Sequence, residues 1–214
     1  MGRGSGTAAV DARALLYGSV PGRTRTGELG WEKKLDDGVI ERYDQYGELV
    51  KLTIPDGGYY QLRDADPDKM AFDEPMTVYL QNKQLHREDG PAIVYADGTE
   101  EYWFENELHR DNGPAIIDKD GSQAWYSHGE QHREDGPAVE RANGTKEYFV
   151  HDLRHREDGP AIVYFSGDKV YCVHGKKHRE DGPAMEWADG THEYWFNGEQ
   201  YSKTKWQQVV QLNS

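Results

Sequence analysis

The stretch His86-Arg87-Glu88-Asp89-Gly90-Pro91-Ala92 decides the fold, because it recurs along the chain at a fixed interval. Further copies begin at His109, His132, His155 and His178, each 23 residues after the one before. The copy at His109 reads HRDNGPA, and the other four are identical. A short unit repeated five times without a gap is typical of repeat proteins, in which each unit stacks mainly on its neighbours.

Each 23-residue unit contains the sequence signature of a β-hairpin. A dipeptide ending in Gly, such as Asp97-Gly98, lies between two runs rich in apolar and aromatic residues. Such dipeptides favour tight primed turns, which need positive φ angles. We expect strands at about 91–96 and 99–104, with Pro91 at a strand start, where its missing N–H does least harm. The sequence therefore predicts an all-β fold, an elongated array of antiparallel β-hairpins.

Weaker copies of the unit precede the array. The five full units occupy residues 86–200, and Tyr79 lies 23 residues before Tyr102, in the same aromatic column. We therefore expect residues 31–85 to form degenerate β-repeats that cap the N-terminal end, with a hairpin at 39–52.

The two ends of the chain depart from the repeat. Tyr201 stands where the next His would fall, and the phrase is lost. We expect residues 201–214 to cap the array with a closing strand at 206–212. Residues 1–30 contain seven of the 24 glycines and are predicted to form an extended arm.

The acidic charge lies in the five units. The chain has a net charge of −14, and residues 86–200 carry 12 Lys and Arg against 25 Asp and Glu, a net −13. A surface of this sign disfavours nucleic acid and anionic lipid, both of which need basic side chains. We therefore expect a protein partner or further copies of the chain, with no nucleic acid and no membrane.

Compartment signals are few. The single cysteine, Cys172, allows no intramolecular disulfide. No apolar run is long enough for a bilayer span, and the N-terminus lacks the apolar core of a signal peptide. We expect a soluble protein that is not secreted through a signal peptide. We expect it in the cytoplasm or within a virus or phage particle.

The first histidine of each unit raises the question of a metal site, since imidazole is a common metal ligand. Copies two strands apart would be about 10 Å from each other, too far for two of them to share one ion. We expect instead that the His, Arg and Asp of each phrase bond the loops of adjacent units, and we predict no metal and no cofactor. The histidines in question, structural markers of the repeat, are His86, His109, His132, His155 and His178.

Two adjacent aromatic columns, at positions 17 and 18 of the unit, are the candidate partner-binding residues. Neighbours in a strand face opposite sides of a sheet, so a single layer of hairpins cannot bury both columns by itself. Exposed aromatic stripes mark interaction surfaces, while packing within the fold is the other interpretation. The columns consist of Tyr102, Trp103, Trp125, Tyr126, Tyr148, Phe149, Tyr171, Tyr194 and Trp195, with Cys172 as a small substitute in one copy.

These columns resemble the MORN repeat family. Tyr194-Trp195-Phe196-Asn197-Gly198 is similar to the aromatic opening and turn of that motif, and Gly90 with Asp97-Gly98-Thr99 to its closing half. The HRxDGPA phrase is similar to a variant in bacterial, phage and giant-virus proteins. The resemblance implies a rolled or flat antiparallel sheet, a scaffolding or binding role, and no shared catalytic residues. Some family members resemble antitoxins and others bind phosphoinositides.

The sequence as a whole predicts a non-enzymatic repeat protein. Our first hypothesis is a structural or protein-interaction component of a larger assembly, such as a phage or virus particle. The second is an antitoxin, immunity or anti-defence protein that sequesters a basic target. A hydrolase or lyase without a recognisable site is a third and weaker one, because acid pairs such as Glu88-Asp89 recur four times and chemistry is rarely repeated along a rod.

Overall fold

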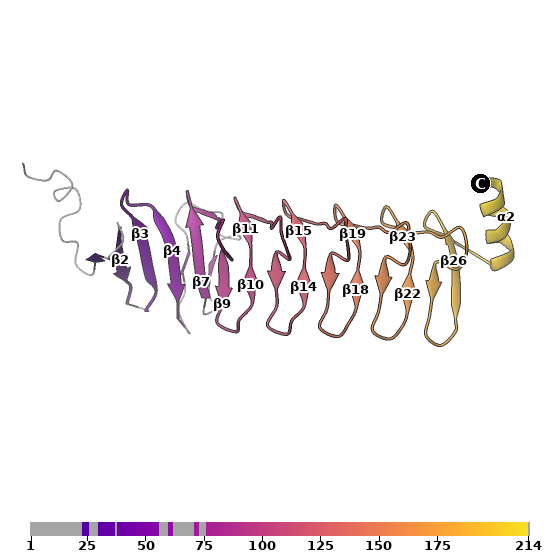
Figure 1. The fold of residues 1–214 in the computed structure, drawn as a ribbon, viewed down its shortest axis with the longest axis horizontal. Coiled ribbons are helices and arrows are strands. Elements are labelled where there is room, and N and C mark those ends of the chain that lie inside the picture. Colours follow the sequence, from indigo (N-terminus) through magenta and orange to yellow (C-terminus); the bar gives the residue numbers. More distant parts are fainter. Residues whose placement is uncertain are drawn as a thin grey trace, which may run out of the picture.

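A computed structural model of the chain describes residues 23–25, 30–36, 38–55, 60–61, 71–72 and 76–213. These residues are almost all β, and 15 strands pair antiparallel in chain order to form one long sheet (Figure 1). The sheet consists of β1 (Arg23–Arg25), β2 (Gly30–Lys34), β3 (Ile40–Asp44), β4 (Leu49–Ile54), β7 (Met76–Gln81), β9 (Ile93–Tyr95), β10 (Glu100–Glu101), β13 (Ile116–Ile117), β14 (Gln123–Ala124), β17 (Val139–Glu140), β18 (Lys146–Glu147), β21 (Ile162–Val163), β22 (Lys169–Val170), β25 (Met185–Glu186) and β26 (His192–Phe196). The expected all-β array of consecutive hairpins is confirmed.

Each unit contains a second, smaller hairpin in addition to the one in the sheet. In the first unit the chain leaves β10, passes Tyr102 and forms the pair Trp103–Phe104 and Glu107–Leu108. The phrase then leads back to the sheet, so it forms a loop between the small hairpin of one unit and the sheet hairpin of the next. The small hairpins are β7/β8 (Gln84–Leu85), β11 (Trp103–Phe104)/β12 (Glu107–Leu108), β15 (Tyr126–Ser127)/β16 (Glu130–Gln131), β19 (Phe149–Val150)/β20 (Leu153–Arg154), β23 (Cys172–Val173)/β24 (Lys176–Lys177) and β26/β27 (Glu199–Tyr201).

The primed turns lie in the small hairpins, and our expectation of primed Asp-Gly turns in the sheet hairpins was wrong. In the sheet hairpin only Gly98 has positive φ, at 94°, and its N–H donates to the Tyr95 carbonyl at 3.1 Å. This is a type I turn followed by a left-handed glycine. The Asp97 carboxylate accepts the Thr99 N–H at 2.9 Å, which satisfies that donor within the loop.

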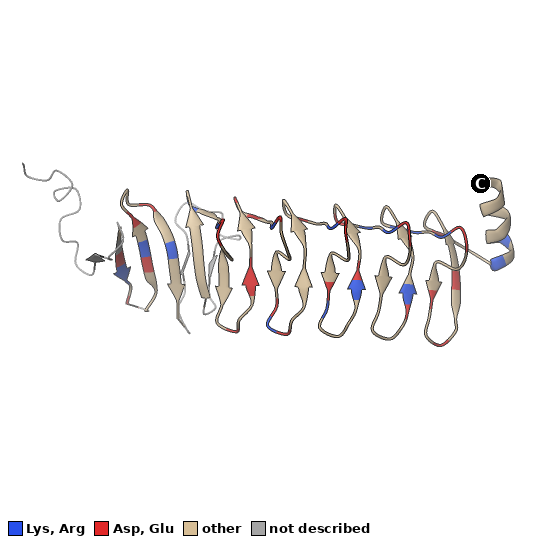
Figure 2. Ribbon diagram, in the orientation of Figure 1, with Lys and Arg blue, Asp and Glu red and all other residues tan. Residues whose placement is uncertain are grey.

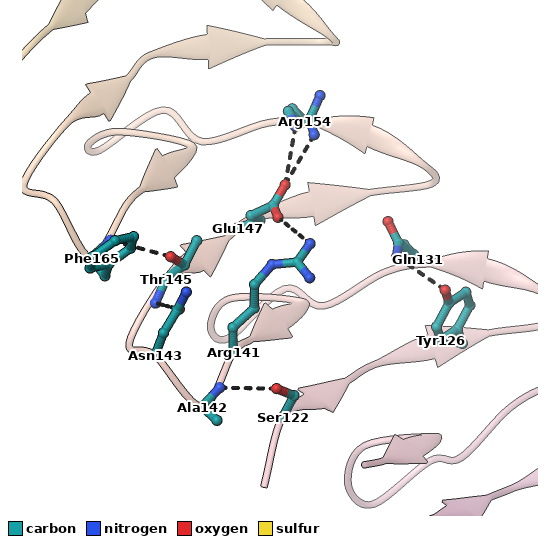
Figure 3. A network of polar contacts seen from close by, with 10 residues as sticks. All are labelled: Ser122, Tyr126, Gln131, Arg141, Ala142, Asn143, Thr145, Glu147, Arg154 and Phe165. Atoms are coloured by element: carbon teal, nitrogen blue, oxygen red, sulfur yellow. Dashed lines mark hydrogen bonds and ion pairs between the residues drawn. The ribbon is translucent and has the colours of Figure 1, made fainter. Parts of the chain in front are cut away.

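Neighbouring units are also bonded at their sheet turns. The hydroxyl at position 14 of one unit accepts a backbone N–H from the next unit, as from Ala142 to Ser122 at 3.0 Å and from Phe165 to Thr145 at 3.2 Å (Figure 3). The series continues with Lys119 N–H to Thr99 at 3.3 Å. These bonds fix the stacking of adjacent hairpins at the edge of the sheet.

The largest apolar cluster lies near the N-terminal end. It includes Val39, Leu52, Ile54 and Val78, all at most 2% exposed. The hairpin expected at 39–52 is confirmed by the pairing of β3 with β4. The predicted arm lies mostly outside the described residues, which include from it only Gly30 and β1. The strands β5 (Tyr60–Gln61) and β6 (Ala71–Phe72) form a separate pair.

The C-terminal cap is a helix, and our prediction of a closing strand at 206–212 was wrong. Helix α2 (Lys203–Asn213) lies at the end of the array and packs on β26 (Figure 1). Trp206 is its buried residue, 7% exposed. No helix among the described residues is both long and apolar enough to cross a bilayer.

Candidate functional site

The first histidine of each phrase supports the turn of the small hairpin that follows it. Its Nδ1 accepts the backbone N–H of the first turn residue, 19 positions later, at 3.1–3.4 Å. That residue has positive φ in every unit, for example 51° at Glu105. Because Nδ1 accepts, the neutral ring carries its proton on Nε2. The histidine column therefore stabilises a strained turn in each copy.

The ring of the same histidine packs against an aromatic ring that lies at one position in the middle units and at another in the two end units. In the middle units this partner is the turn residue, as for His109 on His128, with ring centroids 4.2 Å apart. In the end units the partner comes one residue earlier, at Phe104 and Phe196. His128, His151 and His174, which are exposed on one side, thus also contact the first histidine of their unit through ring stacking.

We expect His132→Ala to destabilise the chain by about 0.5–1.5 kcal/mol, because it removes the hydrogen bond to the His151 N–H and the ring contact. His132→Asn is the matched control, since its side-chain oxygen can accept the same N–H. Urea denaturation followed by circular dichroism measures both. An Ala variant that unfolds at the same urea concentration as the parent would contradict this role.

The arginine of each phrase lies against the aromatic ring at position 17 of the preceding unit. The distance from the guanidinium carbon to the ring centroid is 3.7–4.1 Å in all five copies. In four copies the arginine Nε also donates to the Asp two residues on, at 2.6–2.8 Å. The position-17 rings are thus covered by the chain itself, a contact of the cation–π type.

The rest of the phrase follows from this arginine. A Cβ on Gly136 would lie 2.9 Å from the guanidinium carbon of Arg133, so a larger residue would displace it. The Pro137 carbonyl accepts from Arg133 at 3.2 Å. The alanine that ends the phrase is fully buried in each copy, at Ala92, Ala115, Ala138, Ala161 and Ala184. The His, Arg, Gly, Pro and Ala of the phrase therefore have structural roles.

The aromatic columns offer little exposed ring surface. Phe149 is 8% exposed, and the other eight candidate rings are half-buried. Trp103 and Trp195 each donate an indole N–H to the Glu two residues before, at 2.8 Å. Whether these columns bind a partner stays a prediction, but their contacts within the chain are extensive.

The carboxylates at positions 3 and 4 of the phrase are the outward-facing charges, and we call them the acidic ridge. Acidic segments recur from unit to unit along the array (Figure 2). The ridge side chains are 60–87% exposed. The ridge comprises Glu88, Asp89, Asp111, Glu134, Asp135, Glu157, Asp158, Glu180 and Asp181.

Four ridge aspartates are held ionised by their arginine neighbours. The hydrogen bond from Arg87 lowers the pKa of Asp89. In the other three phrases the equivalent arginine lowers the pKa of Asp135, Asp158 and Asp181 in the same way. Pairing with arginine therefore favours the charged form of these four aspartates.

A hollow of about 360 Å³ lies between the phrase loops of the third and fourth units. Ridge carboxylates of both phrases line it, among them Glu134 and Asp158, together with Tyr148 and Val150. The arrangement offers negative charge beside apolar surface, which suits a side chain with an aliphatic stem and a cationic end.

The site carries no arrangement typical of a metal centre or a nucleophile. Within residues 76–213 and the other described segments, no three His, Cys, Asp or Glu side chains cluster closely enough to hold a metal ion. Cys172 is 4% exposed, and burial raises the pKa of its thiol, so the thiolate is disfavoured. No protein-family model matches the chain, and no curated protein matches it.

Proposed function

We propose that this chain is a non-catalytic interaction protein, a rod that serves as a structural component of a larger assembly. A phage or virus particle is the setting we propose, in line with the resemblance of its units to MORN repeats. The observation that carries the proposal is the division of labour within the phrase. Five of its seven residues stabilise the fold within and between units, while Glu88 and its equivalents face outward at 60% exposure or more.

The partner surface is proposed to be basic. Opposite charges across an interface steer association and select the partner. A sequestering role, as in an antitoxin or immunity protein that covers one basic target, uses the same surface and is the second candidate. The two differ in the size of the complex formed.

The test compares the intact chain with two variants of equal charge change. One carries Glu→Gln at the four ridge glutamates Glu88, Glu134, Glu157 and Glu180. The control carries Glu→Gln at Glu105, Glu107, Glu130 and Glu199, which lie in the small hairpins. Each tagged chain is mixed with extract of its native source, and its mass distribution is measured by sedimentation.

We expect the intact chain and the control to enter a large particle and the ridge variant to remain free. A small complex of one chain with one target would replace the assembly role by the sequestering role. If the intact chain enters no complex of either size, the proposed function is wrong.

A further inference from the structure

We infer that the acidic ridge binds an extended basic segment of a partner protein, in polyproline II conformation, with a Lys or Arg at every third residue. This inference rests on the proposed interaction function and names the chemistry of the partner. It follows from the spacing, charge and shape of the phrase loops.

The spacing of the phrase loops matches one kind of backbone. Neighbouring strands are about 4.7–4.9 Å apart, so units of two strands recur at about 9.4–9.8 Å. A polyproline II segment has three residues per turn and rises about 3.1 Å per residue, or about 9.3 Å per turn. Residues three apart in such a segment lie on the same face, and each of them therefore meets the phrase loop of a new unit.

Other regular backbones do not fit this spacing. Three residues of a β-strand span about 10 Å, but side chains three apart point to opposite faces. An α-helix rises about 1.5 Å per residue and needs more than six residues per unit, which is not a whole number of turns. Only the three-fold segment keeps both the distance and the face.

The charge of each phrase matches one cation per unit. With neutral histidine, Arg133, Glu134 and Asp135 sum to −1, and the same holds at Arg87, Arg156 and Arg179. The phrase at Arg110 is neutral, because Asn112 replaces the aspartate. The third, fourth and fifth units are thus the longest uninterrupted run of net negative phrases, and we place the centre of binding there.

The hollow between the third and fourth phrases offers a place for one of the cations. It joins Glu134 and Asp135 of one phrase to Glu157 and Asp158 of the next, with Tyr148 beside them. Arg156 already covers one face of Tyr148, so the stem of a partner Lys or Arg lies along Val150 while its charge reaches carboxylates of two units.

A buried donor beside the ridge also lacks an acceptor. The side chain of His86 is 7% exposed, and its Nε2 has no hydrogen-bond partner while lying 3.8 Å from Glu88. Since Nδ1 accepts from Glu105, Nε2 carries the proton and points toward the ridge. A polyproline II backbone has no internal hydrogen bonds, so one of its carbonyl oxygens can accept from this donor once the phrase loop shifts to uncover Nε2, which is buried in the free chain.

The test uses two labelled peptides of the same composition, five arginines and ten prolines. One repeats Arg-Pro-Pro, and in the other the five arginines are contiguous. We expect fluorescence anisotropy to show at least about tenfold tighter binding of the spaced peptide to the full chain, because each arginine then meets its own unit.

The matched variants locate the site. Glu→Gln at Glu134, Glu157 and Glu180 should remove the preference for the spaced peptide, while Glu→Gln at Glu105, Glu107 and Glu130 should keep it. Equal affinity for both peptides, or binding of neither, overturns this inference. The sedimentation test decides the proposed function separately, since assembly through the ridge does not depend on the conformation of a peptide.

Discussion

Replacing Trp206 by alanine is expected to lower the free energy of unfolding by about 3–5 kcal/mol, as for other buried aromatic residues. The ring is 7% exposed and lies 5.1 Å from the ring of Tyr194. Its indole N–H donates to the Arg179 carbonyl at 3.0 Å. Truncation therefore removes apolar burial, a ring contact and a hydrogen bond at once.

Trp206 also replaces a missing sixth phrase. Tyr194 occupies position 17 of the last unit, and the equivalent rings of earlier units lie under the arginine of the next phrase. No arginine follows Tyr194 at that place, and Trp206 contacts its ring instead. The indole thus closes the row of stacked rings.

Urea denaturation and hydrogen exchange test the Trp206 prediction together. Repeat units contact mainly their neighbours, so the loss of protection should be greatest in the fifth unit and small in the first. Gln207→Ala is the control, because this residue is exposed on the same helix. Equal loss of protection in both units would show that Trp206 does not act as a local cap.

The 23-residue period was enough to predict the hairpin array, but not the small hairpins. Their primed turns lack the usual signal in several units, as at Glu105-Asn106 and His151-Asp152, where neither residue is glycine. Positive φ is supported there by contacts distant in sequence. His86 accepts the Glu105 N–H, and the Asn106 side chain accepts the Leu85 N–H at 2.7 Å. Turn propensity alone therefore does not account for the positive φ angles of these two turns.

The C-terminal helix could have been predicted. Trp206, Val209 and Val210 follow the three- and four-residue spacing of a helical face, and Ser202 precedes the first turn. The Ser202 hydroxyl accepts the Lys205 N–H at 3.4 Å, as an N-cap does.

The structure altered our view of the candidate site more than our view of the fold. Sequence reasoning favoured the aromatic columns because large apolar side chains at a surface attract partners. The structure covers the position-17 rings with arginines, a pairing of residues that belong to successive units. Once those arginines are assigned to packing, the carboxylates beside them are the more exposed groups, and they are the ones that we propose for recognition.

The double substitution Arg141→Ala and Arg154→Ala is expected to destabilise the chain by about 3–5 kcal/mol, because it leaves a buried carboxylate without a counter-charge. Glu147 is 6% exposed and lies between the two arginines (Figure 3). Its oxygens accept from Arg141 at 2.9 Å and from Arg154 at 3.0 Å. Each arginine is about half-exposed, so water can solvate either one, but not the carboxylate.

Adding Glu147→Val to this variant should restore most of the lost stability. The fourth unit has Val170 at the same position, 5% exposed, and the second has Ala124, so the repeat already accommodates apolar residues there. Replacing a buried ion pair by packed apolar side chains is often neutral or stabilising. Urea midpoints of the parent, double and triple variants measure the effect. A triple variant no more stable than the double would show that the arginines act through packing on neighbours such as Phe149, 5.3 Å from Arg154, rather than through the charge of Glu147.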